Sequence, residues 1–285
     1  MRTALRWAGY GLAGLLVLAL LAAAWVWFAS SRVIAGTIEA RPERLVLPAS
    51  LDLAQAERRA RTLGCLSCHR EGLSGGSFID DPMVAKLHAP NLPALAARAT
   101  DQQLAQAIRQ GIGYDGRPLF IMPSEAYQFL TDEETAALVA YIRSLPRKGA
   151  ASPAPAVGPL GRLGIAMGQF DTTPELVDSY RERQAADLGP QFAQGRHLAM
   201  TTCSGCHGAD LSGRAVSPEV DAPSLDIAAA YDLPAFTRLL REGVAPPGRP
   251  IEEMKDVARN DSRFYTDEEI AALHAYLVER AQRAQ

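Results

Sequence analysis

One five-residue pattern, Cys-x-x-Cys-His, occurs twice in this chain and constrains it more than any other feature. The first copy spans Cys65–His69 and the second spans Cys203–His207. The two copies contain all four cysteines of the 285-residue sequence. No cysteine is therefore left over for a disulfide to another part of the chain or for a catalytic thiol.

The pattern is the attachment signature of a c-type haem, and each position in it has a chemical reason. The two thiols add across the two vinyl groups of one porphyrin, and the histidine that follows is held under the ring with its imidazole facing the iron. The sequence therefore predicts two covalently bound haem c groups. The predicted attachment residues are Cys65, Cys68 and His69 for the first haem and Cys203, Cys206 and His207 for the second.

Two other uses of paired cysteines fit the sequence less well. The two pairs of a four-thiolate zinc site usually lie about 15–20 residues apart, whereas well over a hundred residues separate the pairs here. A thioredoxin-like redox pair needs one motif within a βαβ pattern, and that pattern is missing from the sequence. Haem attachment is the interpretation that uses both motifs.

Composition agrees with small helical domains and excludes one class of partner. Hydrophobic residues make up 48% of the chain but aromatic residues only 7%, so alanine supplies much of the apolar content. The formal net charge of −3 indicates no broad basic surface, so no nucleic-acid partner is expected. The length is sufficient for a membrane anchor and two domains of about a hundred residues each.

The N-terminal segment has the length and composition of a transmembrane helix. No charged residue occurs from Ala8 to Ala29, and about 20 apolar residues are enough to cross a bilayer. Arg2 and Arg6 precede this run and favour a cytoplasmic N-terminus. Residues 1–30 are thus predicted to be a single-pass anchor in a bacterial inner membrane, with the haem domains in the periplasm.

A cleaved signal peptide is the alternative for this segment. Ala22–Ala24 offers small residues at a possible cleavage site. The apolar run continues past that site through Trp25 to Phe28, so we expect the anchor to be retained. Both alternatives export the rest of the chain.

An internal duplication divides the exported part into two domains. Gly111–Met122 overlays Gly243–Met254 without a gap and with five identical residues, and Thr131–Ile142 overlays Thr266–Leu277 with nine of twelve identical. Each of the second pair of segments begins with a capping-box pattern, Thr-x-x-Glu. The predicted divisions are a tether at 31–50, domain 1 at 51–146, a linker at 147–189 and domain 2 at 190–285. The linker has prolines and glycines near 151–161, where we expect little regular structure, and a possible helix at 173–186 that packs against a domain.

The order of elements in each half resembles class I cytochrome c. That order is a helix, Cys-x-x-Cys-His, a proline loop, a helix, a methionine loop and a C-terminal helix, over about 51–146 and 190–280. The resemblance implies an all-α fold, with an N-terminal transmembrane helix followed by two haem domains. It also implies that His69 and Met122 are ligands of the first iron, and His207 and Met254 of the second. The carbonyls of Pro90 and Pro223 are expected to accept a hydrogen bond from the ligand histidines and to orient them.

One position departs from the family pattern, which usually has glycine eight residues before the first haem cysteine. Gly195 matches it in domain 2, but Glu57 stands there in domain 1. We therefore expect the terminal helices to cross differently in domain 1. Tyr141 and Tyr276 are expected to pack in these crossings.

Other side chains able to bind iron are expected to serve packing or surface roles instead. They are Met83, Met167, Met200, His88, His197 and His274. The two methionine loops also differ in charge, because Glu252, Glu253 and Asp256 surround Met254 whereas Met122 has apolar neighbours. Negative charge stabilises Fe(III), so the second haem is expected to have the lower potential.

Function follows from the ligands that the resemblance implies. A haem with protein ligands on both faces has no open position for substrate and suits electron transfer, so the chain is predicted to be an electron carrier rather than an enzyme. It is similar to membrane-bound dihaem cytochromes that serve respiratory chains and periplasmic dehydrogenases. Its expected partners are a dehydrogenase, a quinol-oxidising complex or a terminal oxidase. The alternatives are a subunit of a periplasmic dehydrogenase complex and a dihaem peroxidase-like enzyme, which the two methionine loops disfavour.

Overall fold

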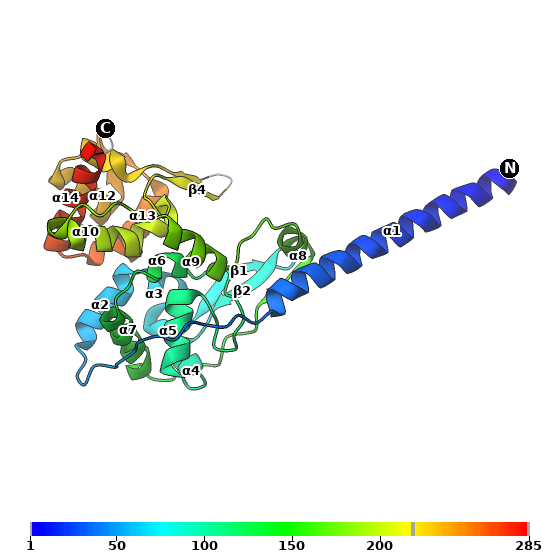
Figure 1. The fold of residues 1–285 in the computed structure, drawn as a ribbon, viewed down its shortest axis with the longest axis horizontal. Coiled ribbons are helices and arrows are strands. Elements are labelled where there is room, and N and C mark those ends of the chain that lie inside the picture. Colours follow the sequence, from blue (N-terminus) through cyan, green and yellow to red (C-terminus); the bar gives the residue numbers. More distant parts are fainter. Residues whose placement is uncertain (1, 218–219, 284–285) are drawn as a thin grey trace.

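A long helix projects from a body of two small helical domains (Figure 1). The computed structural model describes residues 2–217 and 220–283. The projecting helix, α1, spans Arg2–Ala35, and residues 5–35 are long and apolar enough to cross a membrane. The predicted architecture of one apolar N-terminal helix followed by two helical domains is confirmed.

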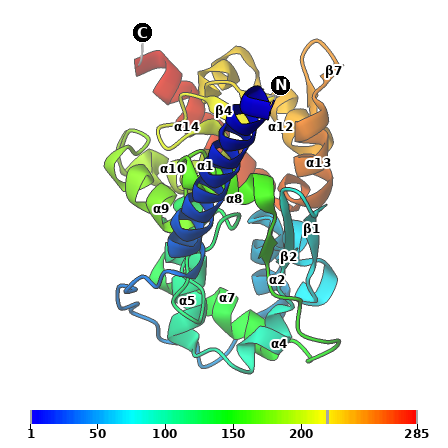
Figure 2. The same ribbon diagram turned by 90° about the vertical axis from the view of Figure 1, so that its right-hand side faces the viewer.

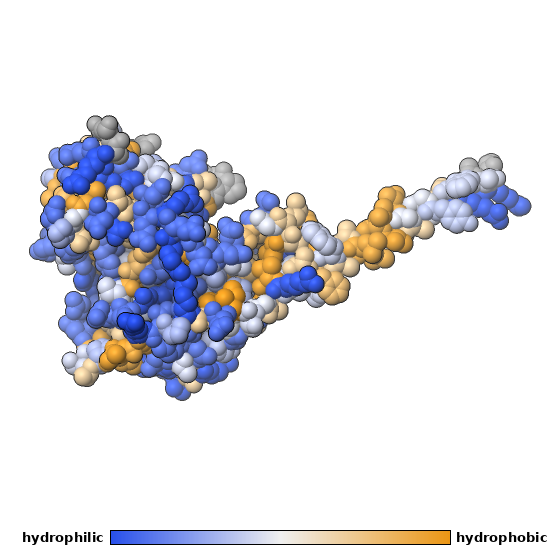
Figure 3. Space-filling view, viewed as in Figure 1, coloured by the Kyte–Doolittle hydropathy of each residue, from blue (hydrophilic) through white to orange (hydrophobic). Residues whose placement is uncertain are grey.

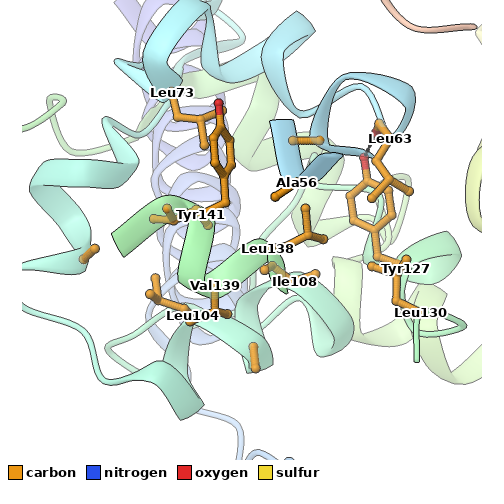
Figure 4. Packing of buried hydrophobic residues seen from close by; sticks show 14 of the residues in the cluster. Ala56, Leu63, Leu73, Leu104, Ile108, Tyr127, Leu130, Leu138, Val139 and Tyr141 are labelled. Atoms are coloured by element: carbon orange, nitrogen blue, oxygen red, sulfur yellow. Dashed lines mark hydrogen bonds between the residues drawn. The ribbon is translucent and has the colours of Figure 1, made fainter. Parts of the chain in front are cut away.

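Domain 1 packs its helices around one apolar core. Its helices are α2 (Leu53–Thr62), α3 (Cys65–His69), η1 (Glu71–Leu73), α4 (Leu92–Ala96), α5 (Asp101–Gln110), α6 (Ser124–Tyr127) and α7 (Asp132–Ser144). Ala56 of α2, Ile108 of α5 and Leu138 of α7 belong to this core (Figure 4). The core thus joins the elements on both sides of the first haem motif.

Domain 2 repeats this arrangement with local differences. Its helices are η2 (Pro190–Phe192), α10 (Ala193–Leu198), the π-turn η3 (Ala199–Cys203), α11 (Ser204–His207), η4 (Leu225–Ala230), α12 (Leu233–Glu242), α13 (Glu252–Asn260), η5 (Ser262–Phe264) and α14 (Asp267–Arg283). The strands β6 (Val244–Ala245) and β7 (Arg249–Pro250) form a short hairpin before α13. A second core surrounds Met200 and Tyr276.

Each haem motif is followed by a short antiparallel hairpin that the sequence did not predict. In domain 1, β1 (Gly76–Asp81) pairs with β2 (Ala85–Ala89), and in domain 2, β4 (Arg214–Ser217) pairs with β5 (Val220–Ala222). Side chains of β1 and β4 are mostly exposed. Their sequences therefore lack the clear alternation of apolar and polar residues that predicts a strand. The hairpins matter because each one leads directly into the proline that contacts the ligand histidine.

The linker is more ordered than its composition suggests. The expected helix is confirmed as α9 (Thr173–Glu182), which packs against α6. The expectation of little regular structure near residues 151–161 is wrong in part, because β3 (Ala156–Val157) adds to β2 and α8 spans Pro159–Ala166. A Cβ at Gly161 would lie 2.2 Å from the Val84 carbonyl oxygen, so glycine here permits a helix to pack directly on the backbone of domain 1.

The helix α1 extends beyond the end predicted for the anchor. It continues for five residues past residue 30, to Ala35. Val33 and Ile34 are partly buried there, and α1 contacts α8. The extended tether therefore begins after Ala35, because tertiary packing against the linker prolongs the helix.

Candidate functional site

The first haem motif presents a buried and oriented imidazole. The motif forms the short helix α3, and His69 at its end is 8% exposed. His69 Nδ1 lies 2.8 Å from the Pro90 carbonyl oxygen. The carbonyl only accepts, so Nδ1 carries the proton and donates, which leaves the lone pair of Nε2 free. Burial also lowers the pKa of His69, so the ring is held neutral, as an iron ligand must be.

The second motif repeats this geometry. His207 ends α11, and its Nδ1 lies 2.8 Å from the Pro223 carbonyl oxygen. Burial lowers the pKa of His207 as well. The two prolines thus stand where the sequence placed them, and each supplies the acceptor that fixes the tautomer of its histidine.

None of the four cysteines forms a disulfide, and each pair lies in its own domain. Burial raises the pKa of Cys65 to about 12 and that of Cys203 to about 11, and it also raises the pKa values of Cys68 and Cys206. Within residues 2–217 and 220–283, no cluster of three or more His, Cys, Asp or Glu side chains is placed to hold a metal ion. The geometry therefore gives no support to a shared four-thiolate zinc site.

A pocket in domain 1 brings the predicted ligands of the first iron together. Cys65, His69 and Met122 all line it. The rest of the lining consists of Ala60, Leu63, Leu73, Leu92, Ile108, Tyr127, Leu130, Leu138, Tyr141 and Ile142. Met83, the nearest rival in sequence, is absent from the lining and is 51% exposed. An apolar pocket with a thiol, an imidazole and a thioether fits a haem, and Met122 remains the predicted sixth ligand.

Domain 2 places its methionine differently. Met122 lies in a bend before α6, whereas Met254 lies in the first turn of α13. Met254 and Cys203 both pack against the second core. The gap-free alignment of the two loops therefore conceals a change of backbone from a bend to a helix. The role of Met254 as ligand stays a prediction.

The residues of both sites fit haem c, which supplies a one-electron Fe(III)/Fe(II) couple when bound. The cysteines would hold the ring edge, and the histidine and methionine would bind the iron. The proline carbonyl orients the imidazole and increases its basicity. The apolar walls exclude water and disfavour the additional charge of Fe(III).

The remaining methionines and histidines occupy the packing and surface positions expected of them. Met200 is buried in the second core and Met167 is 58% exposed. His197 Nε2 lies 2.8 Å from Glu134 Oε2, and His274 Nε2 lies 2.8 Å from the Tyr231 carbonyl oxygen. His88 lies on β2.

The terminal helices cross differently in the two domains. At Gly195, a Cβ would lie 2.1 Å from the Ala272 carbonyl oxygen and 2.7 Å from Tyr276 Cβ. In domain 1, α2 instead buries Ala56 and Ala60. Glu57 is partly exposed and pairs with Arg61 at 2.7 Å. The small side chains of Ala56 and Ala60, on either side of Glu57, therefore replace the missing glycine.

Each haem motif contacts the other domain. Ser67 of the first motif donates a hydrogen bond to Asp261, which lies seven residues after Met254. Gly205 of the second motif faces Pro123 and Ala126, which follow Met122, at 3.8 and 4.0 Å from a Cβ built on the glycine. Both attachment motifs therefore lie at the boundary between the domains.

The capping-box glutamate of each domain contacts a side chain of the other domain across this boundary. Glu134 Oε1 lies 2.7 Å from Arg59 Nη2, and the same carboxylate contacts His197 of domain 2. Although burial raises the pKa of Glu134, the hydrogen bond from His197 and the charge of Arg59 lower it to about 2. Glu269 of domain 2 makes a two-pronged pair with Arg58 of domain 1, at 2.8 and 3.1 Å. Such bidentate pairs fix geometry as well as charge.

Two acidic residues at the boundary were not predicted from the sequence to belong to a site. Burial raises the pKa of Asp261 to about 6, although the hydrogen bond from Ser67 opposes the shift. Burial also raises the pKa of Glu125, which is 6% exposed, to about 7. Neither belongs to a motif. Only the docking of the domains brings Asp261 to the first motif.

The acidic residues around Met254 are expected to lower the potential of the second haem less than their sequence position suggests. Glu252 pairs with Lys255 at 2.7 Å and Asp256 pairs with Arg259 at 3.2 Å, and the two carboxylate side chains are 77% and 72% exposed. Solvent and partner charges screen their effect. The lower potential of the second haem stays a prediction, with a smaller expected difference.

Replacing Asp261 with asparagine is expected to make the potential of the first haem less dependent on pH. In the native protein, Asp261 loses its proton as the pH rises through about 6, and the negative charge then lowers the potential. A unit charge at roughly 10 Å and an effective dielectric of about 20 is worth about 1.7 kcal/mol, which corresponds to tens of millivolts. The groups facing Asp261 are Ser67 and the cysteines 65 and 68, and thioether formation removes the titration of those cysteines. Potentiometric titration between pH 5 and pH 8 measures the slope.

The matched control for this variant is Asp256→Asn. Asp256 precedes Asp261 by five residues but is exposed and paired, so its removal should leave the slope nearly unchanged. Equal slopes in the native protein and the Asp261→Asn variant would contradict the prediction.

Comparisons with known proteins agree with this geometry. A family model described as cytochrome c matches the chain twice, over residues 55–146 and 192–281. The chain is also similar to the cytochrome subunit of fructose dehydrogenase from Gluconobacter japonicus, with 25% identity over 249 residues. That match covers 75% of this chain and 49% of the relative, so the chain spans about half the length of that curated protein. With two family domains that together cover more than half of its length, the chain belongs to the cytochrome c family and carries two covalently bound haem c groups.

Proposed function

We propose that this cytochrome is an electron carrier that passes electrons between its two haems across the domain boundary. The observation that carries the proposal is that each haem motif contacts the segment after the other domain's methionine, since Ser67 meets Asp261 and Gly205 meets Pro123 and Ala126. The contact of Glu134 with His197 and the ion pair of Glu269 with Arg58 link the two domains in this geometry. With a histidine and a methionine on each iron, neither haem has an open position for substrate.

A dehydrogenase is the proposed electron donor. The similarity to the cytochrome subunit of fructose dehydrogenase supports a partner of that class. In this proposal, the chain is the cytochrome subunit of a periplasmic dehydrogenase complex or serves such an enzyme as a separate carrier. A quinol-oxidising complex is the alternative donor, and a terminal oxidase is the proposed acceptor.

The proposed location is the outer face of a bacterial inner membrane, with α1 as the anchor. The apolar length of α1 and the arginines that precede its apolar run support this orientation. A signal peptide near the N-terminus has the same properties, so the fate of α1 needs a direct measurement.

We expect α1 to remain attached to the mature protein. Its apolar run continues past the small residues Ala22–Ala24 to Phe28, beyond the usual position of cleavage. Sequencing the N-terminus of the protein isolated from membranes tests this expectation, and an N-terminus near Trp25 would refute it.

Purification from membranes tests the proposed function. The tagged full-length chain is extracted in mild detergent, and the subunits that co-purify are identified by mass spectrometry. Substrate of the co-purifying dehydrogenase should then reduce both haems in a stopped-flow absorbance measurement, whereas the isolated chain should not respond. A high-spin haem in the isolated chain together with peroxide consumption would instead indicate a peroxidase-like enzyme.

A further inference from the structure

The linker helix α8 exposes an apolar stripe. Leu160 and Leu163 of α8 and Met167, its C-cap residue, are 53%, 40% and 58% exposed, and their spacing of three and four residues places them on one side. Phe170 continues the stripe and is 53% exposed. Met83, whose carbonyl accepts a hydrogen bond from the Leu160 amide at 2.9 Å, is 51% exposed beside it. These five residues are called the α8 patch below.

The opposite side of α8 is attached to the end of α1. Arg162 stacks its guanidinium over the Trp27 ring at 4.0 Å. Its Nη1 also donates to Ser30 Oγ at 2.9 Å and to Ser31 Oγ at 3.0 Å. Ser30 is fully buried. Figure 2 shows α8 close to the body end of α1, so the height of α8 relative to the membrane follows that of α1.

If α1 spans the membrane, that height is the outer surface of the bilayer. The uncharged run of α1 ends at Ala29, and Trp25, Trp27 and Phe28 near its end are typical of residues at the boundary between hydrocarbon and water. Because Arg162 contacts residues 27, 30 and 31, α8 lies level with this boundary. Figure 3 shows apolar residues gathered where α1 meets the body of the protein.

A third set of contacts joins α8 rigidly to domain 1. The Gly158 amide donates to the Val84 carbonyl at 2.9 Å, and β3 pairs with β2. The strand β2 leads directly to Pro90, the acceptor for His69. The element at the membrane surface is therefore connected through a short, ordered path to the first haem site.

We propose that the α8 patch lies in the headgroup and acyl boundary of the outer leaflet and sets the orientation of domain 1 on the membrane. This proposal rests on the proposed role of α1 as a membrane anchor. An exposed apolar stripe is costly in water and is stabilised in this boundary, as in amphipathic helices that lie on membranes. Continuity with α1 identifies lipid as the occupant, because the anchor already places α8 against the bilayer.

Spin labels on the full-length protein in lipid nanodiscs test the proposal. All four native cysteines are consumed by haem attachment, so one introduced cysteine is the only site that accepts a label. Leu163→Cys reports on the α8 patch, and Leu233→Cys on α12 is the matched control, since both leucines are 40% exposed. Leu18→Cys reports on α1. The measurement compares collisions of each label with dissolved oxygen, which concentrates in lipid, and with a water-soluble nickel chelate.

We expect the oxygen-to-nickel collision ratio to be several-fold higher at residue 163 than at residue 233, and highest at residue 18. Met167→Cys should repeat the result for 163, and the haem absorbance of each variant verifies that both haems are attached. An aqueous ratio at 163 with a lipid ratio at 18 would overturn the proposal and leave the anchor intact. A label at 163 shielded from both reagents would also overturn it, by indicating contact with a second protein chain. An aqueous ratio at 18 would refute the anchor itself.

Discussion

Replacing Met122 with alanine is expected to make one of the two haems high-spin and able to bind carbon monoxide, while the other is unchanged. The thioether lines the same pocket as His69, and alanine leaves that side of the iron open. Loss of the soft ligand should lower the potential of this haem by on the order of 0.1 V, a fraction of the about 0.8 V over which axial ligands tune haem. Absorbance spectra with and without carbon monoxide measure the effect.

The matched variants for Met122 are Met254→Ala and Met83→Ala. Met254→Ala should open the other haem, and the double variant should open both. Met83 is half exposed and absent from the pocket lining, so its removal should leave the spectrum unchanged. A Met122→Ala variant that stays wholly low-spin and does not bind carbon monoxide would exclude Met122 as the ligand.

Replacing Gly195 with alanine is expected to destabilise domain 2 by about 3 kcal/mol, at the upper end of the usual cost of overpacking. The added Cβ would lie 2.1 Å from the Ala272 carbonyl oxygen. Backbone cannot rotate away as a flexible side chain does, so α10 and α14 must separate. For a domain of this size, that cost corresponds to a fall in Tm of more than about 10 °C. Thermal unfolding followed by circular dichroism and haem absorbance measures it.

Glu57→Ala is the control at the equivalent position of domain 1. Glu57 is partly exposed and pairs with Arg61, so its replacement should lower the free energy of unfolding by no more than about 0.5–1 kcal/mol. A similar loss of stability in the two variants would show that the two helix crossings are alike, contrary to the structure. An unaffected Gly195→Ala protein would show that α10 has room to move.

Local sequence patterns were sufficient to predict the haem motifs and most of the long helices. The spacing of Cys65–His69 and Cys203–His207 specifies covalent haem attachment wherever the chain places those residues. The capping boxes at Thr131 and Thr266 form as the sequence predicts, because a cap involves residues only three positions apart. Interactions over so few residues depend little on the rest of the fold.

Weak local signals explain the elements that were missed. The helix α8 begins after Gly158 and contains two more glycines, a composition that disfavours a helix in isolation. Its formation depends on contacts with α1 and with the backbone carbonyls of Met83 and Val84, which are distant in sequence. The extension of α1 to Ala35 has the same cause.

The sequence by itself determined what each haem site is made of, since attachment and proline contacts depend on residue type and local spacing. Only the tertiary structure decided which charges act on which site. Asp261 is closer in sequence to Met254 but contacts the motif of the first haem, whereas Glu252 and Asp256 are exposed and paired. Electrostatic energy depends on distance and solvent screening rather than on position along the chain, and the docking of two duplicated domains sets both.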